Sequence, residues 1–98
     1  MHRPDAVGEV SPEIVEDIRR LVSRELASAG VREPDIMVHP GEDHDGDPAI
    51  IVEIKYRRSS LPFDGRAAAQ ALFRLNSMLH ERGERRFAYI MHGEETGA

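Results

Sequence analysis

The 98-residue chain contains no cysteine and no tryptophan, and its aromatic residues are two tyrosines and three phenylalanines. Without cysteine it forms neither disulfides nor thiolate metal sites, which fits a reducing compartment. No apolar run approaches the roughly 20 residues that span a membrane. The opening segment MHRPDAVGEV also has no apolar stretch of the signal-peptide type. We therefore expect a cytoplasmic protein without membrane contact.

Basic residues are also in short supply, because 13 lysines and arginines face 18 aspartates and glutamates, a formal net charge of -5. A non-specific nucleic-acid binder gains much of its affinity by neutralising phosphates, so this balance argues against that class. The length indicates one small domain with a thin core, which a second subunit or a partner would help to stabilise.

Apolar periodicity predicts two helices. In SPEIVEDIRRLVSRELASAG, residues 11–30, an apolar stripe lies between an N-cap at Ser11 and a stop at Gly30. The second helix is expected over residues 65–82. Residues 1–10 and 93–98 show no periodicity, so we expect one domain at 11–92 with a flexible arm and a flexible tail.

Three segments read as strands, at 35–39, 49–58 and 85–92, and the acidic stretch GEDHDGDP at 41–48 reads as a turn. The first two strands are expected to pair as an antiparallel hairpin. The last two are joined through a helix and are expected to form a right-handed parallel βαβ unit. The fold class is therefore α/β (α+β), a two-layer sandwich of order α-β-β-α-β with both helices on one face of a three-stranded mixed sheet. The strand order stays open.

The segment IIVEIKYRR places Ile51, Glu53, Lys55 and Arg57 on the sheet face opposite the helices. One end of that face is too apolar for a fully solvated surface, and Phe73 lies beside the apolar stripe of the second helix. These features predict a non-enzymatic module of the antitoxin or adaptor kind, which forms a homodimer or binds a protein partner. The predicted interface residues are Ile51, Arg57 and Phe73, and no cofactor is expected.

An alternative follows from Pro34-Asp35 at the start of one strand and Glu53-Ile54-Lys55 on the next. This pattern resembles the PD-(D/E)XK nuclease superfamily, which has the restriction-endonuclease-like fold. The resemblance implies that Asp35 and Glu53 hold Mg²⁺ or Mn²⁺ and that Lys55 assists the attacking water during cleavage of DNA or RNA. Gln70 sits where some small members carry a glutamine. The chain departs from the family core because its first strand is missing.

Simpler interpretations account for the same residues. A Glu-x-Lys pair is common on the exposed face of a half-buried strand. The acidic loop 41–48 is rich in oxygen ligands, but no register places Gly46 and Glu53 at the sixth and twelfth positions of an EF-hand. His39 and His44 lack a convincing set of further zinc ligands. Whether the acidic loop binds a cation stays open.

Overall fold

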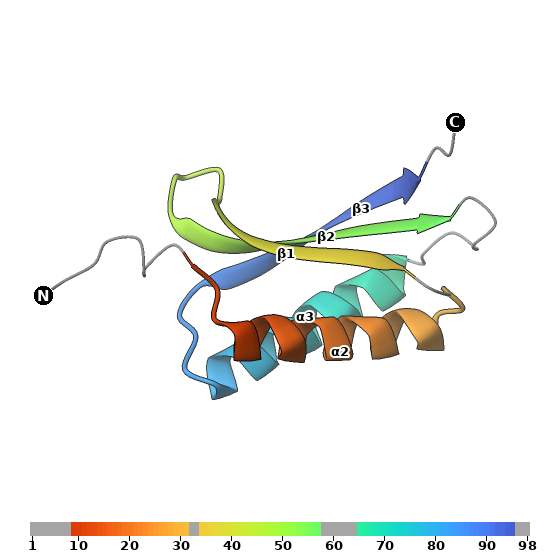
Figure 1. The fold of residues 1–98 in the computed structure, drawn as a ribbon, viewed down its shortest axis with the longest axis horizontal. Helices are drawn as coiled ribbons and strands as arrows, with labels where there is room; N and C mark the ends of the chain where they lie inside the picture. Colours follow the sequence, from red (N-terminus) through yellow and green to blue (C-terminus); the bar gives the residue numbers. More distant parts are fainter. Residues whose placement is uncertain (1–8, 32–33, 58–64, 96–98) are drawn as a thin grey trace, which may run out of the picture.

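A computed structural model describes residues 9–31, 34–57 and 65–95 of the chain (Figure 1). Its elements are α2 (Pro12–Ser28), β1 (Asp35–Glu42), β2 (Pro48–Arg57), α3 (Gly65–Glu81) and β3 (Phe87–Glu95). The sheet order is β1-β2-β3, with β1 antiparallel and β3 parallel to the central β2. Both helices lie on one side of this sheet, which confirms the expected α-β-β-α-β sandwich.

The helices begin and end where local chemistry dictates. The hydroxyl of Ser11 accepts the N–H of Ile14 at 3.3 Å and caps α2, whose first residue is a proline. After α2, Gly30 adopts φ 89° and the next residue, Val31, donates its N–H to the last turn at 2.9 Å. Gly83 ends α3 in the same way at φ 82°. A residue without Cβ occupies this left-handed conformation at little cost.

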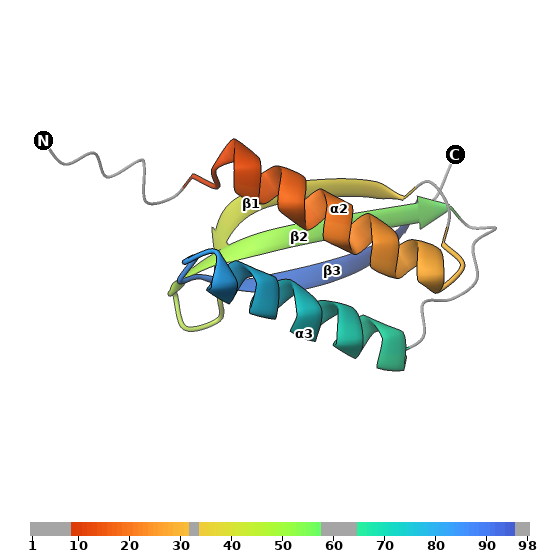
Figure 2. The ribbon, with the colours of Figure 1, turned by 90° about the horizontal axis from the view of Figure 1, so that it is seen from below.

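The core lies between the helices and the sheet, with α2 packed beneath β1 and α3 beneath β3 (Figure 2). Alternation along β2 is sharp, because Ile50, Val52 and Ile54 are at most 1% exposed whereas Lys55 is exposed. The other buried members of the hydrophobic cluster are Ile18, Val22, Leu26, Val31, Ile36, Leu75, Leu79 and Ala88. In the described residues, neither helix is long and apolar enough to cross a membrane.

The bounds of all three strands differ from the sequence expectation, although β2 differs only by one residue at each end, since it begins at Pro48 and ends at Arg57. β1 continues through Pro40 to Glu42. It is an edge strand, where the missing N–H of a proline is tolerated. β3 begins at Phe87 and runs to Glu95, so residues 93–95 of the expected tail belong to the sheet. The end of the expected N-terminal arm is also anchored, because Val10 packs against the core. Residues 1–8 and 96–98 lie outside the described part.

Candidate functional site

The sheet face that carries no helix collects side chains from all three strands. Pairing aligns His39 with Ile51, Ile51 with Tyr89, and Met37 with Glu53. Residues aligned across strands point to the same side of a sheet. We call this surface the open face, and its residues are Asp35, Met37, His39, Ile51, Glu53, Lys55, Phe87, Tyr89 and Met91.

Large apolar side chains on the open face are unusually exposed. Within the described residues, four large apolar side chains count as exposed, and three of them, Met37 at 44%, Phe87 at 48% and Met91 at 58%, lie on this face. The ring of Phe87 lies 5.0 Å from that of Tyr89 at an interplanar angle of 59°. Apolar side chains gathered on one exposed face are typical of an interaction surface.

Ile51 is fitted closely to this face. A Cβ placed on Gly41 would come within 2.6 Å of Cγ1 of Ile51, so the glycine leaves room for the isoleucine to lie across β1. Position 41 therefore requires glycine because the side chain of Ile51 approaches its backbone closely. The half-buried Ile51 therefore lies close to the backbone of the open face. Met37 and Met91 belong to the neighbouring row of aligned residues, on either side of Glu53.

A charged pair lies among these apolar side chains. Nε2 of His39 is 2.6 Å from Oε2 of Glu53, and Nδ1 of His39 is 3.2 Å from the carbonyl oxygen of Pro40. Both partners are acceptors, so the imidazolium form, which donates from both nitrogens, satisfies the geometry best. The hydrogen bond to Glu53, with a smaller contribution from the Pro40 carbonyl, raises the pKa of His39 above its usual value of 6.5.

The three residues implied by the nuclease resemblance share the open face. Asp35 is aligned with Lys55, and Glu53 precedes that lysine by two residues on the same strand. Asp35 and Glu53 therefore lie on a diagonal, and one oxygen of Glu53 already bonds to His39. In the described residues neither carboxylate belongs to a cluster of three or more potential metal ligands.

Asp35 and Glu53 therefore offer two carboxylates on one face, one of them also bonded to His39, to a divalent cation that prefers several oxygen ligands. Gln70 lies on α3, in the layer on the other side of the sheet, so it does not join this group.

The acidic loop contains one compact cluster. Ligand atoms of Asp43, Asp45 and Asp47 lie within 4.8 Å of one another. The backbone explains this arrangement, because Oδ1 of Asp43 accepts the N–H groups of Asp45 and Asp47, each at 2.9 Å. Gly46 closes the turn at φ 84°. His44 lies 3.5 Å from Asp45, and no cluster of three or more potential ligands in the described residues includes it or His39.

The residues of the predicted interface fall on two surfaces. Ile51 lies on the open face, whereas Phe73 lies on α3, in the helix layer. The backbone of Arg57 ends β2, but its side chain lies outside the described part of the structure. The sequence interpretation did not single out Met37, Phe87, Tyr89 or Met91. The signal was available, since each alternates with core residues along an edge strand.

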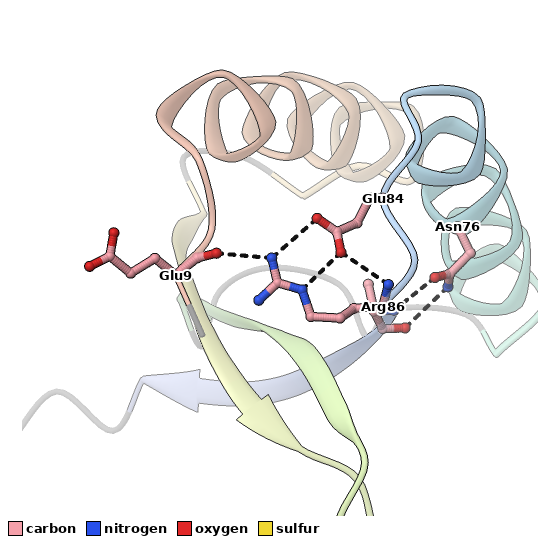
Figure 3. A network of polar contacts seen from close by, with 5 residues as sticks. Glu9, Asn76, Glu84 and Arg86 are labelled. Carbon is pink, nitrogen blue, oxygen red and sulfur yellow. Dashed lines mark hydrogen bonds and ion pairs between the residues drawn. The ribbon is translucent and has the colours of Figure 1, made fainter. Parts of the chain in front are cut away.

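A polar network missed by sequence reasoning joins α3 to β3 (Figure 3). Oδ1 of Asn76 accepts the N–H of Ala88 at 2.7 Å, and its Nδ2 donates to the carbonyl of Ala88 at 3.1 Å. β3 is an edge strand, so these backbone groups have no neighbouring strand at that side. Asn76 therefore satisfies the backbone N–H and carbonyl of Ala88 at this edge of the sheet.

Next to it, Nε of Arg86 donates to Glu84 at 2.8 Å, and both side chains are at most 15% exposed. Another nitrogen of Arg86 donates to the carbonyl of Glu9 at 2.9 Å (Figure 3). The hydrogen bond from Arg86 lowers the pKa of Glu84 below its usual value. The bond from Arg86 to Glu9 therefore connects the start of the described chain to the turn before β3.

The comparisons with known proteins do not assign the chain to a family. No protein-family model and no curated protein matches it. A solved structure of CzrB, described as a proposed zinc transporter, aligns with 88% of this chain and 98% of its own, at 18% identity and a TM-score of 0.47. At that level the likeness says nothing of function.

Proposed function

We propose that the chain is a non-enzymatic module that forms a homodimer in the cytoplasm through the open face of its sheet. The observation that carries the proposal is the exposure of Met37, Phe87 and Met91 on a face that no helix covers. Association would remove these side chains from water, with a gain of about 25 cal/mol for each Å² of apolar surface buried.

A second copy of the chain suits this face because its charges are balanced. Lys55, together with His39 when its imidazole is protonated, offsets Asp35 and Glu53. Two such faces related by a two-fold axis meet without an excess of like charge, and each basic group can approach an acidic group of the other copy. A partner of strongly one-sided charge would gain little from a balanced face, so a homodimer fits better.

The first test is the mass in solution of the wild-type chain and of Met91→Asp, measured by sedimentation equilibrium. We expect the wild type to approach twice its monomer mass of 11.0 kDa at high concentration. The Met91 side chain is 58% exposed, so the substitution leaves the fold intact while it places an unpaired carboxylate in the interface. We expect its dimer dissociation constant to rise at least about tenfold.

Phe73→Asp is the matched control, because it makes the same kind of change on α3, outside the open face. Its self-association is expected to equal that of the wild type. A wild-type chain that stays monomeric up to millimolar concentration would refute the proposal. So would a Met91→Asp variant that dimerises as tightly as the wild type.

A metal-dependent nuclease is the second candidate, and the observation in its favour is the shared face of Asp35, Glu53 and Lys55. It is tested by incubating the chain with Mg²⁺ or Mn²⁺ and plasmid DNA, single-stranded DNA or RNA, with Lys55→Ala in parallel. Cleavage by the wild type and a loss of about a hundredfold or more in the variant would support this function. Equal background in both preparations would exclude it for these substrates.

A further inference from the structure

The outer side of α3 presents an exposed aromatic ridge between two hollows. Phe73 is 73% exposed, the highest value among the large apolar side chains of the described residues. It lines a hollow of about 780 Å³ that extends past Leu72 and Asn76 to Phe87. It also lines a second hollow of about 390 Å³, together with Ala69 and Gln70. One large side chain therefore separates two depressions on the same helix.

The spacing on α3 explains this shape. Ala69, Phe73 and Ser77 follow one another at intervals of four residues, so they lie along one row of the helix surface. A small side chain stands on each side of the phenylalanine. Helices pack by fitting such rows of side chains into the grooves of a neighbouring helix. The row on α3 is therefore shaped to accept large apolar side chains of another helix on either side of Phe73.

The stretch of chain that includes Phe73 is basic, whereas the chain as a whole is acidic. Residues 65–86 contain five arginines and two glutamates, a net charge of +3, whereas the whole chain carries -5. Arg82 is bonded to Asp17 of α2 at 2.8 Å, so its charge is already offset. Arg85 forms no ion pair within the described residues. Arg74 bonds to Glu25 at 2.9 Å through one nitrogen, but its side chain remains 60% exposed and its guanidinium has further donors. Glu84 is occupied by Arg86.

We propose that this α3 surface docks an amphipathic helix of another protein, whose apolar side chains straddle Phe73 and whose flanks are acidic. A second copy of the chain fits poorly here, because a two-fold contact would bring the arginines of α3 against themselves. The site lies on the helix layer and meets the open face only at Phe87, so it does not require self-association. Together the two surfaces would let a dimer hold two partner helices.

The test uses two synthetic helical peptides of equal length with leucines at the same i, i+4 positions. One has glutamates on both flanks and the other has lysines. Each is titrated into the ¹⁵N-labelled full chain. We expect the glutamate peptide to bind at least about tenfold more tightly, with the largest chemical shift changes around Ala69, Phe73 and Ser77. Phe73→Ala is expected to weaken that binding about tenfold or more.

Two further variants separate this surface from the open face. Arg85→Glu is expected to weaken the glutamate peptide and to favour the lysine peptide, whereas Met91→Asp leaves the affinity of both unchanged. Equal affinity for the two peptides, no binding of either at millimolar concentration, or shift changes confined to the open face would each overturn the inference. Because Phe73 is mostly exposed, its replacement by alanine leaves the fold intact.

Discussion

The two faces of β2 are formed by the same ten residues but differ in how far they are buried. Ile50, Val52 and Ile54 point toward the helices and are almost fully buried, whereas Ile51 and Glu53 on the other face remain half-buried. A two-layer sandwich with one sheet covers only one side of that sheet. The helix-covered face therefore supplies the buried core, whereas the open face leaves large apolar side chains exposed.

The largest effect that tests this contrast is a pair of matched truncations on β2. Ile50→Ala is expected to lower the free energy of unfolding by about 2–5 kcal/mol, since Ile50 is fully buried and its loss leaves a cavity. Ile51→Ala removes the same atoms from a half-buried position and is expected to cost about 1 kcal/mol. Urea denaturation at low protein concentration measures both. Equal losses would contradict the distinction between the two faces.

The second effect on stability concerns the outer edge of β3, where Asn76 of α3 bonds the backbone of Ala88. Asn76→Leu would leave the N–H and carbonyl of Ala88 without partners, and we expect a loss of about 1–3 kcal/mol. Thermal or urea denaturation gives the value. The neighbouring change Ser77→Ala serves as control and is expected to stay within about 0.5 kcal/mol. A stable Asn76→Leu variant would show that water replaces the amide without cost.

Asn76 also illustrates what the sequence allowed us to predict. Apolar periodicity and capping residues predicted both helices, all three strands and the side that the helices cover, because these depend on neighbours along the chain. Asn76 received no role, because its partner Ala88 lies twelve residues away on an edge that only the tertiary fold creates. The pairs Glu84–Arg86 and His39–Glu53 were likewise missed. Strand order was not predictable for the same reason.

The candidate site was predicted in part. Alternation along β2 placed Ile51, Glu53 and Lys55 on the face without helices, where the register confirms them. Met37 and Met91 were not chosen, because their closeness to Ile51 depends on which strands are neighbours and on the register between them. Phe73 was assigned to the same interface from its position beside the apolar stripe. The structure separates it into another layer.

A charge swap on the open face is expected to act on association with little effect on folding. Lys55→Glu leaves three acidic groups on the face and is expected to weaken the dimer about tenfold by like-charge repulsion. Exchanging both charges, Asp35→Lys with Lys55→Glu, restores the balance and is expected to restore association. Sedimentation equilibrium measures each dissociation constant. If Lys55→Glu dimerises as tightly as the wild type, the charge balance of the face plays no part in self-association.

The smallest expected effect is the pH dependence that His39 adds to stability. Its pKa is raised in the folded chain, chiefly by the hydrogen bond to Glu53, so the pair stabilises the fold fully below the usual histidine value of 6.5. This contribution is lost as the pH rises through the raised value. Both side chains are more than a third exposed, at 44% and 35%, so solvent limits the loss to less than about 1 kcal/mol.

The measurement is the free energy of unfolding at pH 6 and pH 9 for the wild type and for His39→Gln, at concentrations low enough to keep the chain monomeric. Glutamine retains a hydrogen-bond donor toward Glu53 but does not titrate, so the decrease between the two pH values should be smaller in the variant. The same decrease in both proteins would assign the pH dependence to other groups and leave the His39–Glu53 pair as a neutral hydrogen bond. In that case the His39–Glu53 pair would add no pH-dependent stability to the chain, and the charges of the open face would act only on self-association.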